Sequence, residues 1–407
     1  MSNYKSDIKA LASKASLYPQ EALLRVGNDK HSLTIGIPKE ITVLENRLCL
    51  TPEAVALLVN NGHQVRIEAG AGGPSKFSDQ DFSDAGAQIA YSTKEVYESD
   101  IILKIEPPSE QEIEYMQPGK TLISALQTAK LRPEYIHALN NKKVTALAFE
   151  LIEDKVGGMP VIRAMSEIAG STVMLIASEY LNSVNNGKGI ILGGITGVPP
   201  TVVVILGAGT VAEYAARTAL GLGAEIKIFD NQIYKLRRLK HALGQQVYTS
   251  TIDTVTLQDI LKRADVVIGA MRAEKGKNKC IVTEEMVSSM RPNSVIIDVS
   301  IDQGGCFETS ELTTHSSPVF KKYDVIHYCV PNIASRVART ATTALSNILT
   351  PIVIQIAEAG GIDDMIFNNS WLMRGVYTYK GSLTNYNLAR KLNMRHKDLS
   401  LFMAARI

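Results

Sequence analysis

Residues Thr201 to Asp230 constrain the fold of this 407-residue chain more than any other segment. They read TVVVILGAGTVAEYAARTALGLGAEIKIFD. An apolar, β-branched run, typical of a buried parallel strand, leads directly into Gly207 and Gly209. A helical stretch from about Val211 to Leu222 follows, and a second strand ends at the acid. The segment therefore predicts a βαβ unit whose helix aims its free N–H groups and positive dipole end at the glycine turn.

The spacing within this unit suits the pyrophosphate and ribose of a dinucleotide. Gly207 allows a tight turn, Gly209 lets the backbone approach the pyrophosphate, and Ala212 is small enough for the helix to pack closely on the strand. Asp230 stands 23 residues after Gly207, where a carboxylate accepts from both ribose hydroxyls and repels a 2′-phosphate. The sequence thus predicts NAD rather than NADP as cofactor. The alternative is a plain βαβ unit that binds no nucleotide.

Length, charge and cysteine usage narrow the class of protein. The 407 residues suggest two or three domains, and near-equal numbers of basic (43) and acidic (41) residues argue against nucleic acid or an anionic membrane as partner. The N-terminus lacks the apolar core of a secretory signal, and no apolar run is expected to approach the roughly 20 residues that span a bilayer. Widely spaced cysteines without a CxxC pair indicate a reduced, cytoplasmic protein without a metal site: Cys49, Cys280, Cys306 and Cys329.

Alternating strands and helices predict an α/β fold with two Rossmann-like domains. The substrate domain is expected to be discontinuous, residues 1–165 plus 340–407, and the NAD-binding domain, residues 166–339, to contain a doubly wound parallel sheet. Strands are predicted at 33–37, 63–69, 100–105, 121–126 and 144–150 in the first domain, and at 201–206, 225–229, 265–270, 294–299 and 324–330 in the second.

A helix is predicted within the first domain at residues 51–61, and a long helix between the two domains at residues 160–185. The long helix has Ser166 as its N-cap and is expected to serve as a hinge. A final long helix begins near Ser335 and returns its apolar face to the first domain. The first 31 residues are expected to be a partly helical extension, and residues 360–407 a cap rather than a domain.

A series of further motifs occurs in unbroken order between residues 36 and 340. They are GIPKEI (36–41), ENRLCLTPEAV (45–55), EAGAGGPSKFSD (68–79), ILKIEPP (102–108), MSEIAG (165–170), GAGTVAEYAA (207–216), IDVSIDQGGCFETS (297–310) and HYCVPN (327–332). In this combination the chain resembles bacterial alanine dehydrogenases and, behind them, the α-subunit of proton-translocating transhydrogenase. The resemblance implies an NAD-dependent oxidoreductase of amino-acid metabolism that reversibly deaminates L-alanine to pyruvate and ammonia.

The resemblance also implies roles for three charged residues. Arg47 and Lys104 would hold the carboxylate and carbonyl of the substrate, and the planar fork of a guanidinium suits a carboxylate. Lys104 is expected at the rim of the sheet, since its strand closes with two prolines. Asp302 follows a predicted strand at its carboxyl end and would take part in the proton chemistry beside the nicotinamide.

The remaining residues that the resemblance implies are contacts with the cofactor. They are Met165, Ser166, Gly207, Gly209, Thr210, Val211, Asp230, Lys235, Ile301, Asp302, Val330 and Asn332.

The resemblance also implies a homo-oligomer, because relatives of this kind assemble through their long helices.

One position departs from the pattern of the family. Gln127 stands where these dehydrogenases carry a histidine that acts as acid or base, and glutamine does not titrate near neutrality. His327, near the expected cofactor edge, is the candidate replacement acid. Three functions therefore stay open: an alanine dehydrogenase, an NAD-binding homologue without activity or with another substrate, and hydride exchange between nucleotides.

Overall fold

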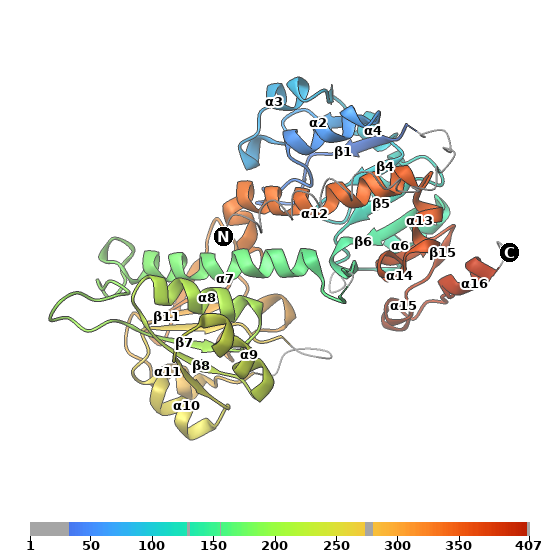
Figure 1. The fold of residues 1–407 in the computed structure, drawn as a ribbon. Coiled ribbons are helices and arrows are strands. Elements are labelled where there is room, and N and C mark those ends of the chain that lie inside the picture. The colour runs from blue at the N-terminus through green and yellow to red at the C-terminus, as the bar shows by residue number, and fades with distance from the viewer. Residues whose placement is uncertain (1–31, 128–130, 155, 273–279, 405–407) are drawn as a thin grey trace, which may run out of the picture.

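The computed structural model describes residues 32–127, 131–154, 156–272 and 280–404, which form two sheets joined by two long helices (Figure 1). The predicted N-terminal extension, residues 1–31, lies outside the described residues. Both sheets are mainly parallel and carry helices on both faces, which confirms the α/β class with two Rossmann-like units. The described residues also include every predicted site residue.

The first sheet has eight strands in the order β15-β14-β6-β5-β4-β1-β2-β3. Their bounds are β1 Thr34–Ile37, β2 Gln64–Glu68, β3 Gln88–Ala90, β4 Ile101–Leu103, β5 Thr121–Ser124, β6 Thr145–Ala148, β14 Val376–Tyr379 and β15 Ser382–Leu383. All five predicted strands are present, and β3 was missed. The expectation of a cap at 360–407 needs correction, because β14 pairs antiparallel with β6 and extends the sheet. No local sequence pattern revealed this pairing, because β14 is short and its partner β6 lies more than two hundred residues earlier in the chain.

The second sheet has seven strands in the order β12-β13-β11-β10-β7-β8-β9. Their bounds are β7 Val202–Leu206, β8 Glu225–Phe229, β9 Tyr248–Ser250, β10 Val266–Gly269, β11 Val295–Asp298, β12 Val319–Lys322 and β13 Val325–Tyr328. The five predicted strands form its parallel core. The sequence did not predict β9 or the antiparallel edge strand β12.

Separate apolar clusters pack on the two faces of each sheet. In the first unit one face holds residues of α2 and α12, such as Val55 and Leu349, and the opposite face holds Ile113 and Ile136. The shorter helices of this unit are α2 Pro52–Asn60, α3 Asp79–Asp84, α4 Thr93–Tyr97, α5 Glu110–Tyr115, α6 Pro133–Asn141, α13 Ile362–Asn368, α14 Ser370–Met373, α15 Tyr386–Leu392 and α16 Leu399–Ala404. In the nucleotide unit they are α8 Thr210–Gly221, α9 Ile233–Leu243, α10 Thr254–Leu261 and α11 Glu284–Ser288.

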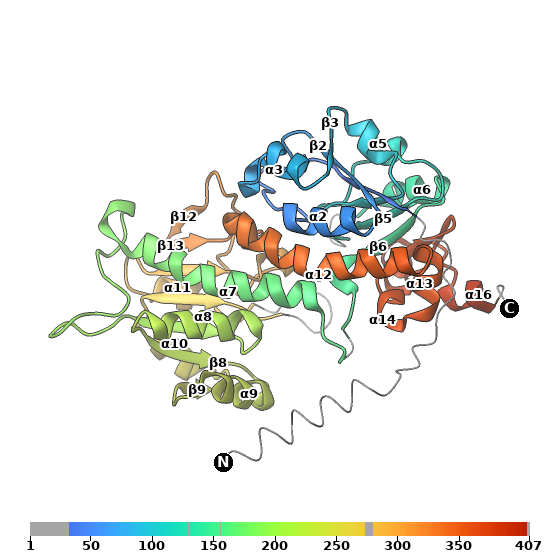
Figure 2. The same ribbon diagram turned by 45° about the horizontal axis from the view of Figure 1, so that its top comes forward.

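Two long helices, α7 (Pro160–Leu181) and α12 (Ala338–Glu358), connect the units and run side by side in both views (Figures 1 and 2). Helix α7 begins at Pro160, where the fixed φ of proline suits the first helical turn, so Ser166 lies inside the helix and the predicted N-cap role is wrong. Gly170 lets α7 approach α8 closely, because a Cβ there would lie 2.4 Å from the Val211 carbonyl oxygen. As predicted, α12 packs its apolar face on the first sheet.

The expectation that no segment is apolar enough to span a bilayer also needs correction. By length and composition alone, α7 and the stretch Ile333–Glu358 pass that test. The fold buries 44% and 56% of the residues in their most apolar windows, as it does in core helices of globular proteins. Their apolar character is accounted for by packing on α8, on the first sheet and on one another.

Candidate active site

The glycine turn after β7 has the geometry that the sequence predicted. Gly207 has a φ of 110°, and a Cβ on it would lie 2.6 Å from the Ala270 carbonyl oxygen, so only glycine fits. A Cβ on Gly209, in contrast, would meet no atom within 4 Å. Helix α8 starts at Thr210 with no side-chain cap on its first N–H groups. The turn therefore leaves open space in front of uncapped N–H donors, which fits a pyrophosphate.

Asp230 is fixed beside this turn. Its carboxylate accepts hydrogen bonds of 2.8 Å from the backbone N–H groups of Ala208 and Gln232, and the residue is 5% exposed. Each carboxylate oxygen keeps a lone pair for a ribose hydroxyl. On α9, Lys235 lies near the ring of Tyr234, and Arg238 donates to the Ala208 carbonyl oxygen at 3.0 Å. The sequence did not single out Arg238, although it stands eight residues after the acid.

Asp302 lies on a loop that a second, buried aspartate holds in place. Asp302 belongs to the 3-10 helix η4 (Ile301–Gln303) and is exposed, yet partial desolvation raises the pKa of its carboxyl above the usual value, against the lowering effect of Arg272. The fully buried Asp298 accepts hydrogen bonds from the backbone N–H groups of Ser300 and Cys306 at 3.0 and 2.8 Å. These hydrogen bonds to Asp298 therefore hold the loop that carries Asp302 in place.

The two units meet through Glu45, which sequence reasoning missed. Its buried carboxylate accepts from Arg47 Nε at 2.8 Å and Nη2 at 2.6 Å, and from Asn332 Nδ2 at 2.7 Å. Although burial opposes ionisation, the hydrogen bonds and charge of Arg47 hold the pKa of Glu45 below its usual value. Ser335 adds a second link, since its hydroxyl donates to the Leu44 carbonyl oxygen at 2.7 Å. We call the contact of residues 44–47 with residues 332–335 the junction.

Arg47 reaches from the junction toward α7. Its Nη1 lies 3.5 Å from the sulfur of Met165, and its side chain is 13% exposed. Burial alone would lower the pKa of Arg47, but the hydrogen bonds and charge of Glu45, together with Glu106 and Glu40, raise it. The structure thus brings together three predicted site residues, Arg47, Met165 and Asn332. Ser166 follows on the same helix, and Val330 is buried below the junction.

Lys104 directly follows the last residue of β4, so its predicted position at the carboxyl end of the strand is confirmed, but its side chain is enclosed. Its side chain is completely buried, and Nζ lies 2.7 Å from Glu40 and 3.8 Å from Glu112. The reason is strand alternation: Ile102 belongs to the apolar cluster on the α5 and α6 face, and Lys104, two residues on, points to the same face. Burial raises the pKa of Glu40 to about 7, despite the lowering effect of Lys104. The prolines end the strand, but the ammonium itself is enclosed.

Gln127 is paired with an acid that the sequence analysis passed over. Its Nε2 donates a short hydrogen bond to Oε2 of Glu106. The two residues follow neighbouring parallel strands, β4 and β5, whose ladder continues to the bond from Ala125 N to the Ile105 carbonyl oxygen. Glu106 was recognisable as the residue beyond a strand end in ILKIEPP. Its partner was visible only once β4 and β5 were known to be neighbours.

His327 is not a replacement acid for this site. It is fully buried on β13, where Nε2 contacts the Thr309 hydroxyl at 2.8 Å and Nδ1 the Val325 carbonyl oxygen at 3.0 Å. Burial lowers its pKa, so the ring stays neutral within the sheet. His315 is half-buried, and its Nε2 lies 2.8 Å from the carbonyl oxygen of Asn332.

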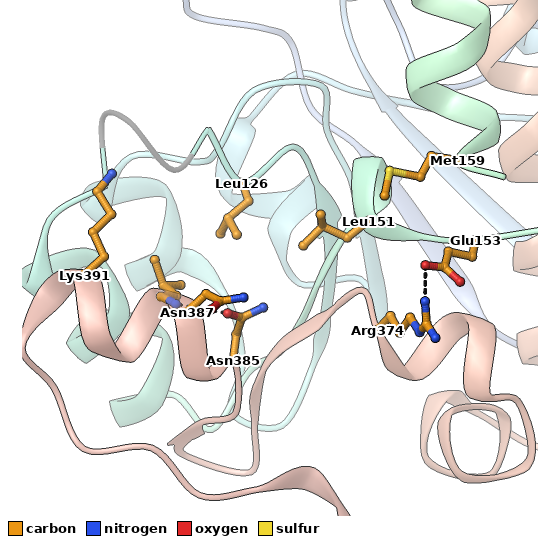
Figure 3. Close-up of a pocket in the computed structure, with 9 residues that line it drawn as sticks. Leu126, Leu151, Glu153, Met159, Arg374, Asn385, Asn387 and Lys391 are labelled. Carbon is orange, nitrogen blue, oxygen red and sulfur yellow. Dashed lines mark hydrogen bonds and ion pairs between the residues drawn. The ribbon is translucent and has the colours of Figure 1, made fainter. Parts of the chain in front are cut away.

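A cavity of about 440 Å³ lies beside the strand end that precedes Gln127 (Figure 3). Leu126, Leu151 and Met159 line it on one side, and residues of the tail face them: Arg374, Asn385, Asn387, Leu388 and Lys391. Arg374 is paired with Glu153 at one end of the cavity. Among the described residues, no group of three or more His, Cys, Asp or Glu side chains is placed to hold a metal ion.

Two family models cover most of the chain. The one described as "Alanine dehydrogenase/PNT, N-terminal domain" matches residues 36–169, and the one described as "Alanine dehydrogenase/PNT, C-terminal domain" matches residues 173–386. The chain is 38% identical to an alanine dehydrogenase of Mycolicibacterium smegmatis, over 91% of this chain and 100% of that protein. It is 39% identical to an alanine dehydrogenase of Bacillus subtilis, over 89% of this chain and 96% of that protein.

Solved structures give the same result. An L-alanine dehydrogenase, 34% identical, superimposes with a TM-score of 0.83 over 88% of this chain and 98% of its own. A transhydrogenase from Sinorhizobium meliloti has a TM-score of 0.75 at 24% identity, over 87% of this chain and 99% of its own, and shows a shared fold.

Proposed function

The chain belongs to the alanine dehydrogenase/PNT family, and from this we propose that it is an NAD-dependent amino-acid dehydrogenase that reversibly deaminates L-alanine to pyruvate and ammonia. The relatives that bear the name alanine dehydrogenase align with this chain over nearly their whole length. The enzyme class and the Rossmann-like fold expected from the motifs are confirmed by these comparisons.

One observation carries the proposal: Glu45 joins Arg47 of one unit to Asn332 of the other, beside Met165. A two-substrate reaction needs the residues that bind the amino acid, here called the substrate wall, next to the residues that bind the dinucleotide, here called the cofactor wall. This contact would bring the two together. Arg47, whose guanidinium lies at the junction, would hold the carboxylate of the amino acid. Asp302, exposed and with a raised pKa, would exchange protons with water.

The cofactor proposal rests on the glycine turn. Gly207 and Gly209 shape it, Thr210 and Val211 open the helix whose N–H groups face the phosphates, and Asp230 would bind the ribose hydroxyls. Lys235 on α9 and Ile301 on the Asp302 loop complete the proposed set. When bound, the dinucleotide supplies the acceptor of the hydride that leaves the α-carbon. The carboxylate of Asp230 disfavours a 2′-phosphate, so NAD is the proposed form.

Lys104 keeps a proposed role, but an indirect one. Its ammonium is enclosed by Glu40 and Glu112, and Glu40 in turn accepts from the backbone N–H of Ile105 at 2.6 Å. Lys104 would therefore fix the end of β4, from which Glu106 projects, rather than grip the substrate.

The test is NADH formation, followed by its absorbance, with L-alanine and a panel of other amino acids, for the wild type and Gln127→His. Turnover with L-alanine supports the proposal. NAD binding without turnover on any member of the panel would assign the chain to the non-enzymatic alternative. A tenfold rise in Gln127→His would show that the missing histidine limits the rate.

We also propose a cytoplasmic homo-oligomer, with the substrate domain at 1–165 plus 340–407 and the NAD-binding domain at 166–339. The four cysteines are unpaired, as in a reducing compartment. Sedimentation velocity would measure the oligomeric state, and a monomer at micromolar concentration would contradict this part of the proposal.

A further inference from the structure

The strongest unassigned feature of the substrate wall is the hydrogen-bonded pair of Glu106 and Gln127. Glu106 is 8% exposed and projects beyond the end of β4, and Gln127 projects beyond the end of β5. The resemblance placed an acid–base side chain at position 127, which now carries an amide. A titratable carboxylate, Glu106, stands at the adjacent position across the sheet.

We propose that Glu106 is the proton acceptor of the deamination reaction in this chain, with Gln127 as the residue that positions it. This inference rests on the proposed dehydrogenase function. Glu106 would touch the α-amine of the substrate, whose carboxylate is held by Arg47.

Contacts around Glu106 support this assignment. Its backbone N–H lies 3.3 Å from Oε2 of Glu40, which fixes the start of the segment. The charge of Glu106 contributes to the raised pKa of Arg47, the residue that would bind the substrate carboxylate. Arg47 in turn lies against α7, with its Nη1 3.5 Å from the sulfur of Met165.

Gln127 is itself held firmly. Its φ of 43° lies in the left-handed region, where a residue other than glycine is strained, and such strain concentrates at functional sites. The preceding backbone N–H, of Leu126, donates to Glu150 at 2.7 Å. The amide donor of Gln127 therefore reaches Glu106 from a fixed direction and favours the ionised carboxylate, which is the form a base requires.

Glu106 alone can carry the protons that the deamination reaction moves. Glu106 takes a proton from the substrate ammonium and passes it to solvent. The Cα–H bond then breaks, its electron pair leaves with the hydride, and the nitrogen lone pair forms the C=N bond of an iminium. Water adds to the carbon and gives a proton to Glu106, which returns it to the nitrogen. The C–N bond breaks, and the hydroxyl proton leaves with ammonia as ammonium. The products are the 2-oxo acid, ammonium, the reduced nicotinamide and one proton.

Kinetics of matched variants test the inference. We expect Glu106→Gln to lower kcat about 10²–10⁴-fold and Glu106→Asp, which still titrates, to lower it less. Gln127→Ala should lower kcat about tenfold and shift the acidic limb of the pH profile. Glu110→Gln, an exposed carboxylate on α5, is the control and should match the wild type. Combining Glu106→Gln with Gln127→His should recover much of the lost rate, because a base then returns to the neighbouring position.

The pH profile identifies the titrating group. The charged groups known to act on or contact Glu106 include Arg47, Glu150 and Glu40. The acidic limb of kcat should vanish in Glu106→Gln and persist in Glu40→Gln and Glu150→Gln. An active wild type whose Glu106→Gln variant keeps kcat and the limb overturns the inference and leaves the dehydrogenase function standing. A wild type without turnover on any amino acid overturns both.

Discussion

Asn332, which follows β13 of the nucleotide sheet, donates a 2.7 Å hydrogen bond to Glu45, which follows β1 of the other sheet. The same carboxylate holds Arg47 with two hydrogen bonds, so one buried acid orients the proposed substrate ligand from both units. The hydrogen bond links the proposed cofactor-binding unit to the proposed substrate-binding unit. A movement of one unit relative to the other should therefore change the position of the Arg47 guanidinium.

Removing Asn332 should weaken this link. A hydrogen bond to a charged group contributes about 1.5–3 kcal/mol, so Asn332→Ala should lower the melting temperature by several degrees. The KM for the amino acid should rise, because Arg47 and Glu45 lose a fixed partner. Thermal unfolding and steady-state kinetics measure the two effects. Asn61→Ala, an exposed helix-end residue, is the control for a general loss of stability. An unchanged KM would contradict the proposed role of the junction.

The two glycines of the turn should respond in opposite ways to alanine. At Gly209 a Cβ meets open space, so Gly209→Ala should fold like the wild type and bind NAD at least tenfold more weakly. At Gly207 the positive φ and the 2.6 Å approach to a carbonyl oxygen predict a loss of more than about 1 kcal/mol of folding free energy. Denaturant unfolding and fluorescence titration with NAD separate the two outcomes. Equal effects at both positions would contradict this account of the turn.

Asp230 should set the preference for NAD over NADP. Asp230→Asn keeps one acceptor oxygen, for the backbone N–H of either Ala208 or Gln232, and removes the negative charge. The ratio of the dissociation constants for NADP and NAD should fall about tenfold, helped by the nearby guanidinium of Arg238. Asp259→Asn, on the exposed face of α10, should leave the ratio unchanged. A constant ratio in Asp230→Asn would show that other groups discriminate.

Lys104 should act on stability more than on substrate binding. Lys104→Met leaves Glu40 and Glu112 buried without their cation, and breaking a buried pair in this way costs about 3–5 kcal/mol. Arg217→Met, which removes an exposed i,i+4 pair with Glu213, should cost less than about 0.5 kcal/mol. Urea unfolding gives both values. A stable Lys104→Met variant with a raised KM would instead restore Lys104 as a direct substrate ligand.

The carboxyl of Glu40 should make stability fall with pH. Its pKa is raised by burial from 4.5 to about 7, so between these pH values the folded state binds more protons than the unfolded state. Unfolding free energy therefore decreases as pH rises through this window, by about 3 kcal/mol from this group. Glu40→Gln, which stays neutral, should lack this decrease. Urea midpoints at several pH values between 4.5 and 8 would show it, and parallel curves for the two proteins would refute it.

Local patterns predicted five parallel strands in each sheet, but they missed strands at or near the sheet edges, including the parallel strands β3 and β9. Strands such as β7 and β10 are continuous apolar runs, which a buried parallel strand requires and which can be read along the chain. The short strands β3, β9 and β14 carry too few residues for a period to show, and their pairing depends on neighbours far away in sequence. The prediction of Ser166 as an N-cap failed because the same helix begins six residues earlier, at Pro160.

The sequence by itself determined the cofactor turn, since Gly207, Gly209 and Asp230 lie within one βαβ unit whose geometry follows from local spacing. The tertiary structure alone decided the chemistry of the opposite wall. Strand alternation buried Lys104 on the face of its sheet that α5 and α6 cover, and the adjacency of β4 and β5 brought Glu106 to Gln127. Both depend on which strands are neighbours, and sheet order is set by the packing of the whole core rather than by any segment of the chain.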